Sequence, residues 1–276
     1  MGARQSPRGR TPTPQCTVQE DIMFIDADCH ISSRATDSQG TIDQLLRDLD
    51  ELGVEKAICW PRVALPREIP SDNRAIYEGA KAHPDRIIAF CGVNPCLGPQ
   101  EAKEELKRCI EVYGVKGVKL NGARDGYYID DPELSFPLID MIAGAGLVLA
   151  LHCGSNDFER THPFRIAKIS DAYPHLPIMV VHMGGAARPD LHDATIEFAA
   201  THPNWYLVDS EADYRKVLKA LRVLGPDRIL YGSDNPFCPM RFEWGIRQAI
   251  YQDLSDADRA KVLGGNVARM LGIESG

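Results

Sequence analysis

Residues 22–30 read IMFIDADCH, residues 41–53 read TIDQLLRDLDELG, and residues 54–61 read VEKAICWP. The first and third stretches are apolar runs of strand length, whereas the second has apolar residues at the period of a helix and ends at Gly53. Further apolar runs, separated by helical patterns, lie at 86–95, 115–120, 147–154, 176–185, 204–211 and 228–236. The sequence therefore predicts eight strands that alternate with helices.

This alternation indicates a parallel sheet, because parallel neighbours need a crossover connection and are buried on both faces. Eight such units suit an α/β fold of the (β/α)8 TIM-barrel type. An open doubly wound sheet is the rival, but no GxGxxG motif follows the first predicted strand. We expect residues 21–276 to form one barrel domain and residues 1–20, which are rich in Pro, Arg and Thr, to form a disordered tail.

Composition limits the classes of partner. The net charge of −8 disfavours binding to nucleic acid and to anionic membrane surfaces, because like charges repel. The chain has no signal-peptide pattern and no apolar run long enough to span a membrane, and its eight cysteines contain no CxxC pair. We therefore expect a cytoplasmic protein with reduced thiols and a small-molecule substrate. A homodimer is left open, since dimers are common among such barrels.

Metal-ligand residue types end four of the predicted strands, at the barrel end where function collects. Because side chains alternate along a strand, the candidates of the first strand should share one inward face, whereas Cys29 and Cys153 should point away. Burying several carboxylates together without a cation is costly, so the pattern predicts one divalent metal with nitrogen and oxygen ligands. The candidates are Asp26, Asp28, His30, His152, His182 and Asp234.

Other polar residues carry weaker signals. Arg34, Arg62 and Lys119 are candidates to hold a substrate carboxylate, because a guanidinium group matches a carboxylate bidentately. Each of them is also of a type common at surfaces and in packing. His192 falls within a helical pattern, where we expect it on the solvent face.

With these residues in place, the chain resembles the amidohydrolase superfamily and its amidohydrolase-2 branch, which contains lactonases and metal-dependent non-oxidative decarboxylases. The resemblance covers nearly all of residues 22–272. It rests on IDADCHI (25–31), GVKGVKL (114–120), ALHCG (150–154), VVHMGG (180–185), ILYGSDNPF (229–237) and LGGNVARMLGI (263–273).

The resemblance implies roles for individual residues. It assigns the metal to Asp28, His30, His152 and Asp234, and it makes His182 an acid/base or water-orienting histidine. Lys119 matches the position where two-metal relatives carry a carboxylated lysine, although we expect a single metal. That metal is expected to be zinc, with manganese as the alternative.

One departure bears on the reaction. The usual first-strand motif of the branch is His-x-His, and here the first position is Asp28, which resembles the decarboxylases that carry Glu there. A carboxylate at this position shifts the preference toward manganese or a more weakly held zinc.

The expected function is metal-dependent hydrolysis of a lactone, amide or related acyl-type bond, with Asp234 as the general base for a metal-activated water. The short connection from His30 to the helix at Thr41 favours this reading. The alternative is decarboxylation of a hydroxylated aromatic or unsaturated carboxylic acid, with Asp234 or His182 supplying a proton. A barrel that binds a ligand without turnover is the third hypothesis.

Overall fold

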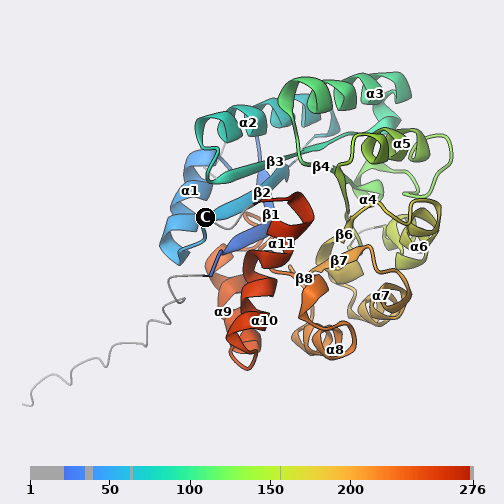
Figure 1. The fold of residues 1–276 in the computed structure, drawn as a ribbon. Helices are drawn as coiled ribbons and strands as arrows, with labels where there is room; N and C mark the ends of the chain where they lie inside the picture. Colours follow the sequence, from blue (N-terminus) through green and yellow to red (C-terminus); the bar gives the residue numbers. More distant parts are fainter. Residues whose placement is uncertain (1–21, 35–39, 63–64, 156, 274–276) are drawn as a thin grey trace, which may run out of the picture.

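The computed structural model describes residues 22–34, 40–62, 65–155 and 157–273, and it confirms the predicted barrel (Figure 1). Eight parallel strands pair in chain order. The tail expected at residues 1–20 lies outside the described residues. The strands are β1 (Ile25–Ile31), β2 (Lys56–Pro61), β3 (Ile87–Gly92), β4 (Gly117–Leu120), β5 (Val148–Leu151), β6 (Ile178–Val180), β7 (Trp205–Val208) and β8 (Ile229–Leu230).

Helices surround the strands (Figure 1). They are α1 (Ile42–Leu52), α2 (Ile69–Ala82), α3 (Pro99–Arg108), α4 (Gly122–Asp125), α5 (Phe136–Gly144), α6 (Pro163–Ala172), α7 (Pro189–Thr201), α8 (Tyr214–Leu224), α9 (Met240–Tyr251), α10 (Asp256–Ala260) and α11 (Asn266–Leu271). The first helix begins where Thr41 caps it and ends at Gly53, whose φ of 69° is left-handed, as the sequence predicted. None of the described helices has the length and apolar character needed to cross a bilayer.

The barrel closes through the backbone that follows β8 rather than through β8 itself. The Ala27 N–H donates to the Tyr231 carbonyl over 2.9 Å, and the His30 N–H donates to the Asn235 carbonyl over 2.7 Å. These bonds hold the stretch 231–235 against β1. They therefore place the first strand and the segment after the last strand side by side.

Two apolar layers hold the strands in place. The outer layer lies between strands and helices, and it includes Cys29 and Cys153, so these thiols point away from the barrel interior as predicted. The interior layer includes Val267 of α11 together with residues of the strands. Burying each large aliphatic or aromatic side chain contributes about 1.5–3 kcal/mol to folding. The interior residues of the strands, with Val181 directly after β6, are Ile25, Ala27, Ile58, Trp60, Ile88, Phe90, Val148, Ala150, Met179, Val181, Val208 and Leu230.

The expectation that His192 faces solvent is wrong. Its side chain is fully buried in α7. A Cβ atom added at Gly185 would lie 2.7 Å from His192 Cδ2, so this helix packs directly beneath the turn that follows β6.

A buried ionic network ties the end of β7 to α9. Arg247 Nε lies 2.9 Å from Asp209 Oδ2, and Arg247 Nη2 lies 3.3 Å from Glu243 Oε2. The Tyr251 hydroxyl donates to Asp209, and the Glu211 N–H donates to Glu243 Oε1 over 3.0 Å. The network thereby holds the backbone on both sides of residue 210.

Glu243 should make the stability of the protein depend on pH. Burial raises the pKa of Glu243 from 4.5 to about 7, although Arg247 opposes the change. A carboxyl group with a raised folded-state pKa favours the folded state at low pH, and this contribution is lost as pH rises toward the folded pKa. In urea denaturation, the Glu243→Gln variant should therefore gain stability relative to the wild type between about pH 4.5 and about pH 7.

The exposed Glu197 of α7 supplies the control, because Glu197→Gln removes a glutamate outside the network. A difference between Glu243→Gln and the wild type that stays constant over this pH range would contradict the assignment.

Candidate metal centre

Left-handed backbone conformations mark the ends of β5 to β8. Among the described residues, every non-glycine residue with positive φ follows one of these four strands. Such conformations cost on the order of 1 kcal/mol or more each and concentrate at functional sites. They are Ser155 (58°), His182 (57°), Met183 (47°), Ala187 (53°), Glu211 (54°) and Asp234 (60°).

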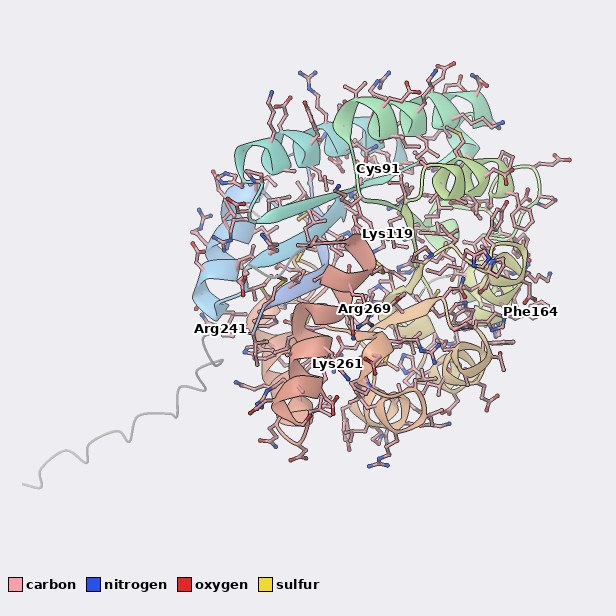
Figure 2. All side chains as sticks on the ribbon, in the orientation of Figure 1. Cys91, Lys119, Phe164, Arg241, Lys261 and Arg269 are labelled. Carbon is pink, nitrogen blue, oxygen red and sulfur yellow. The ribbon has the colours of Figure 1, made fainter. Side chains whose placement is uncertain are left out.

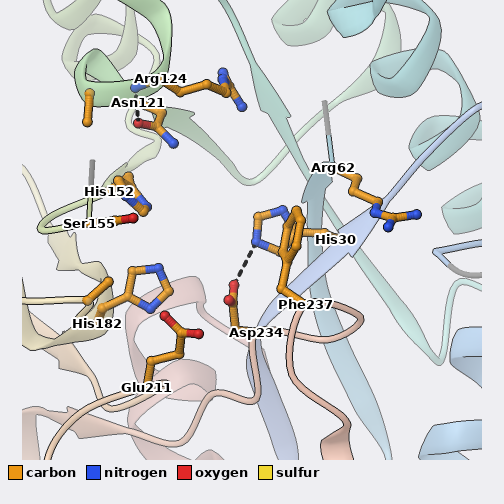
Figure 3. Close-up of a pocket in the computed structure, with 12 residues that line it drawn as sticks. His30, Arg62, Asn121, Arg124, His152, Ser155, His182, Glu211, Asp234 and Phe237 are labelled. Carbon is orange, nitrogen blue, oxygen red and sulfur yellow. Dashed lines mark hydrogen bonds and ion pairs between the residues drawn. The ribbon is translucent and has the colours of Figure 1, made fainter. Parts of the chain in front are cut away.

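Four of these strained residues line one pocket at the carboxyl ends of the strands. The cavity has a volume of about 400 Å³, within the range typical of small-molecule sites. Figure 3 shows His152, Ser155 and His182 on one side, with His30 and Phe237 on the other. The lining residues are His30, Arg62, Asn121, Ala123, Arg124, His152, Ser155, His182, Ala186, Glu211, Asp234 and Phe237.

Asp28, His30 and Asp234 form a compact group whose ligand atoms all lie within 4.8 Å of one another. His30 Nε2 is 3.0 Å from Asp234 Oδ1 and 3.3 Å from Asp28 Oδ1. His30 Nδ1 lies 3.2 Å from the Pro61 carbonyl, which can only accept, so Nδ1 carries hydrogen. The lone pair of Nε2 therefore accepts from the Trp60 indole N–H over 3.1 Å, while two carboxylate oxygens lie beside it. A cation among these groups would remove the repulsion between the carboxylates, so the donor set fits a divalent metal.

Lys119 supplies part of that positive charge. Its Nζ lies 3.5 Å from both Asp28 Oδ1 and His30 Nε2 and 3.9 Å from the ring centre of Trp60. Burial opposes ionisation of Asp28, but Lys119 and His30 hold the pKa of this carboxyl group well below its ordinary value. Burial in turn lowers the pKa of Lys119, despite the attraction of Asp28. Figure 2 shows Lys119 toward the middle of the barrel.

His152 and His182 lie together on the opposite side of the pocket. Their ring centres are 5.0 Å apart, and the two rings meet edge to face. Desolvation, His182 and Lys119 all lower the pKa of His152 well below its ordinary value, which keeps the imidazole neutral. In the described part of the chain, the group around Asp28 does not include His152. The structure thus gathers three of the four expected ligands, and a ligand role for His152 stays a prediction.

A second group of potential ligands shares Asp234. His182, Glu211 and Asp234 have ligand atoms within 4.8 Å of one another. Desolvation raises the pKa of Glu211, although His182 opposes the change. Glu211 therefore adds a second carboxyl group to the lining of the pocket, beside that of Asp234.

The expectation that Asp26 shares the inward face of β1 is wrong. The pairing of β1 with β2 changes register between Asp26 and Cys29, which is a β-bulge. Ala27 packs in the barrel interior, and Asp28 joins the site. Asp26 instead accepts the N–H groups of Asp28 and Ser233, each over 3.0 Å.

The three candidates for substrate binding lie in different places. Arg62 lines the pocket, with its guanidinium carbon 5.6 Å from the ring centre of Phe237. Lys119 lies against the Asp28 group and is not among the lining residues. Arg34 is also absent from the lining; its side chain is 56% exposed and forms a 2.6 Å ion pair with Glu68.

Some lining residues escaped the sequence analysis. Asn121 and Arg124 lie just after β4, so their position at the carboxyl end of a predicted strand could have identified them. Arg124 forms ion-paired hydrogen bonds of 2.6 and 2.7 Å with Asp125. Ser155 and Phe237 lie in the loops after β5 and β8, whose paths no local pattern predicts.

Comparison with known proteins identifies the family of the chain. A family model described as Amidohydrolase matches residues 25–273. Gamma-resorcylate decarboxylase of Rhizobium radiobacter is 23% identical over 320 residues, which cover 94% of this chain and 95% of that protein. 2-Amino-3-carboxymuconate-6-semialdehyde decarboxylase of Dictyostelium discoideum is 23% identical over 240 residues, which cover 73% of this chain and 66% of that protein.

A solved structure has the same fold. It is the dihydroxybenzoic acid decarboxylase from Polaromonas sp. JS666 with bound manganese and the inhibitor 2-nitroresorcinol. The TM-score is 0.73 at 20% sequence identity, and the match covers 91% of this chain and 97% of that one.

These relatives overturn the expectation of hydrolysis. The curated proteins that match most of this chain's length are named decarboxylases, so the findings favour the alternative reading. The short connection after β1 misled the sequence analysis, because both reactions use the same kind of metal site and loop length does not choose between them. The expectation of zinc has no specific support, since the Polaromonas structure holds manganese.

The Asp28 group should bind one divalent cation. In titrations of the metal-free protein with Mn²⁺, followed by electron paramagnetic resonance, Asp28→Asn and Asp234→Asn should each weaken binding. The loss of Mn²⁺ affinity should exceed the roughly 10–100-fold loss that is typical when a residue that only hydrogen-bonds to a metal ligand is removed. His152→Ala, measured alongside, shows whether that histidine is a fourth ligand.

Asp26→Asn is the matched control, since this neighbouring carboxylate turns away from the site and should leave Mn²⁺ affinity unchanged. Wild-type affinity in both Asp28→Asn and Asp234→Asn would rule out the assigned centre.

Proposed function

Because this chain belongs to the amidohydrolase family over residues 25–273, we propose that it is a metal-dependent carboxy-lyase. Its proposed substrate is a hydroxylated aromatic or unsaturated carboxylic acid. The observation that carries the proposal is the Asp28, His30 and Asp234 group at the edge of a pocket that also contains imidazole and guanidinium groups. The matching relatives are named decarboxylases, which supports decarboxylation over the other reactions that such a site could serve.

We infer that Asp28, His30 and Asp234 hold the cation, with His152 as the candidate for a further ligand. When bound, the cation supplies positive charge that attracts the substrate carboxylate and an adjacent hydroxyl group. Manganese and zinc both accept this set of nitrogen and oxygen ligands.

The pocket offers groups that can donate the proton that the reaction consumes. When carbon dioxide leaves, the electron pair of the broken bond stays on the substrate carbon, which must then take up a proton. His182 and Asp234 both line the pocket, and we propose one of them as the donor. Glu211 lies within 4.8 Å of both and can pass a replacement proton from solvent.

The wall of the pocket opposite His152 and His182 suits a planar acid. Arg62 presents a guanidinium group that can hold a carboxylate, and the ring of Phe237 lies beside it. We propose that the Arg62 side chain orients the substrate against the aromatic face.

A two-arm assay tests the reaction. The metal-loaded protein is incubated with hydroxylated benzoic acids and unsaturated carboxylic acids while carbon dioxide release is measured. A parallel arm follows acid release from lactones and amides. We expect turnover in the first arm, and a loss of about 100-fold or more in Asp234→Asn, since general acid catalysis alone contributes roughly 10²–10⁴-fold. Asp193→Asn, on α7 outside the pocket, is the control. Acid release without any carbon dioxide release would refute the carboxy-lyase assignment.

Arg62 should act mainly on substrate binding. Lysine keeps the charge but cannot pair bidentately, so Arg62→Lys should raise KM by about 10-fold and change kcat less. Arg34→Lys makes the same exchange outside the pocket, and its kinetics should match the wild type. Equal kinetics for the two variants would exclude Arg62 from substrate binding.

A further inference from the structure

Ser210 connects the two functional halves of the site without lining the pocket. It follows β7 and is fully buried. Its hydroxyl oxygen lies 2.6 Å from Asp28 Oδ2 and 2.9 Å from His182 Nδ1. A single serine after β7 thus bridges a carboxylate of β1 and an imidazole from the turn after β6.

The direction of these hydrogen bonds follows from the chemistry of the three groups. A serine hydroxyl has one hydrogen, and a carboxylate can only accept, so Ser210 donates to Asp28. The Ser210 oxygen can then only accept from His182 Nδ1. The carbonyl of Ser210, another acceptor, lies 3.3 Å from the same nitrogen. His182 Nδ1 therefore carries hydrogen, which leaves Nε2 as the nitrogen free to exchange a proton in the pocket.

The same serine also determines which oxygen of Asp28 faces the other candidate ligands. Oδ2 accepts from Ser210, while Oδ1 lies 3.3 Å from His30 Nε2 and 3.5 Å from Lys119 Nζ. A carboxylate tied at one oxygen cannot rotate freely, so its other oxygen is presented to the cation site.

The surroundings leave Ser210 little freedom to move. On one side Asp209 is paired with Arg247, and on the other the N–H of Glu211 is bound by Glu243. A Cβ atom added at Gly232 would lie 2.9 Å from the Asp28 Cβ and 3.4 Å from the Ser210 Cβ. The absence of a side chain at residue 232 therefore lets the segment after β8 approach the Asp28–Ser210 contact closely.

We propose that Ser210 is a positioning residue with two effects: it holds His182 in the Nδ1–H tautomer, and it orients Asp28 toward the bound cation. The effect on Asp28 rests on the proposed metal centre, whereas the effect on His182 does not. Ser210 acts through its two partners rather than through the substrate, because its hydroxyl is already engaged by both.

Nitrogen NMR of the full-length, metal-free protein labelled with ¹⁵N-histidine tests the first effect. The His182 signals are assigned by their loss in His182→Gln. The wild type should show hydrogen on Nδ1 and a bare Nε2, and Ser210→Ala should shift the population toward hydrogen on Nε2. Ser210→Cys, nearly the same size but a weak hydrogen-bond partner, should shift it in the same direction. A wild-type His182 with hydrogen on Nε2 alone, or no change in a folded Ser210 variant, would overturn this effect.

Mn²⁺ titration of the same proteins tests the second effect. Ser210→Ala should weaken binding by about 10–100-fold, the usual cost of losing a partner of a metal ligand. Ser170 of α6 supplies the control, because it is a buried serine whose hydroxyl donates to Asn204 over 2.7 Å, away from the site. Ser170→Ala should change neither the His182 tautomer nor the Mn²⁺ affinity. Unchanged Mn²⁺ affinity in both Ser210→Ala and Ser210→Cys would overturn the effect on Asp28.

Kinetics separate this inference from the proposed reaction. With an acid that the protein decarboxylates, Ser210→Ala should lower kcat about 10-fold or more and leave KM nearly unchanged, since Ser210 contacts no substrate. Shifts in tautomer and Mn²⁺ affinity without carbon dioxide release from any acid would uphold the role of Ser210 and refute only the carboxy-lyase proposal. A fall in substrate affinity alone, with both other readouts unchanged, would overturn the positioning role.

Discussion

The hydrogen bonds between β1 and the segment after β8 are the contacts on which the candidate site depends. Ala27 and His30 donate to the carbonyl groups of Tyr231 and Asn235, and these bonds close the barrel. They also bring the His30 imidazole to 3.0 Å from Asp234, a residue 204 positions away in the chain. Closing the barrel and assembling the candidate centre therefore require the same contacts, so a barrel that opened at this seam would lose its candidate ligands.

Charge balance is the second constraint on the site. Two buried carboxylates and a lysine meet around His30, and the lysine offsets one negative charge. A cation beside His30 would balance the remaining negative charge, since Nε2 of His30 already accepts from the Trp60 indole N–H. A group of this kind is costly in an apolar barrel, and the left-handed conformations of His182, Glu211 and Asp234 add to that cost. Packing around the carboxyl ends of the strands, including the ionic network of Arg247, holds these residues in place.

Family membership and site geometry answer different questions about this protein. The Asp28 group would serve hydrolysis or decarboxylation equally well, because each reaction needs a cation and nearby proton-transfer groups. The side chains proposed to hold the substrate, Arg62 and Phe237, come from the separate loops after β2 and β8. A family match over nearly the whole chain identifies the scaffold, and the named relatives indicate which reaction to test first.

The sequence alone determined the order of the strands, the barrel and the strand ends that carry Asp28, His30 and Asp234, because apolar periodicity is a local property of the chain. It misplaced Asp26, since a β-bulge arises from pairing with β2, and it misplaced His192, whose helix packs beneath the turn that holds His182. Ser210 left no signal, because its partners lie 182 and 28 positions away. Only the tertiary structure decides which side-chain atoms meet, because those distances depend on strand register and barrel closure, and neither is encoded in any single segment.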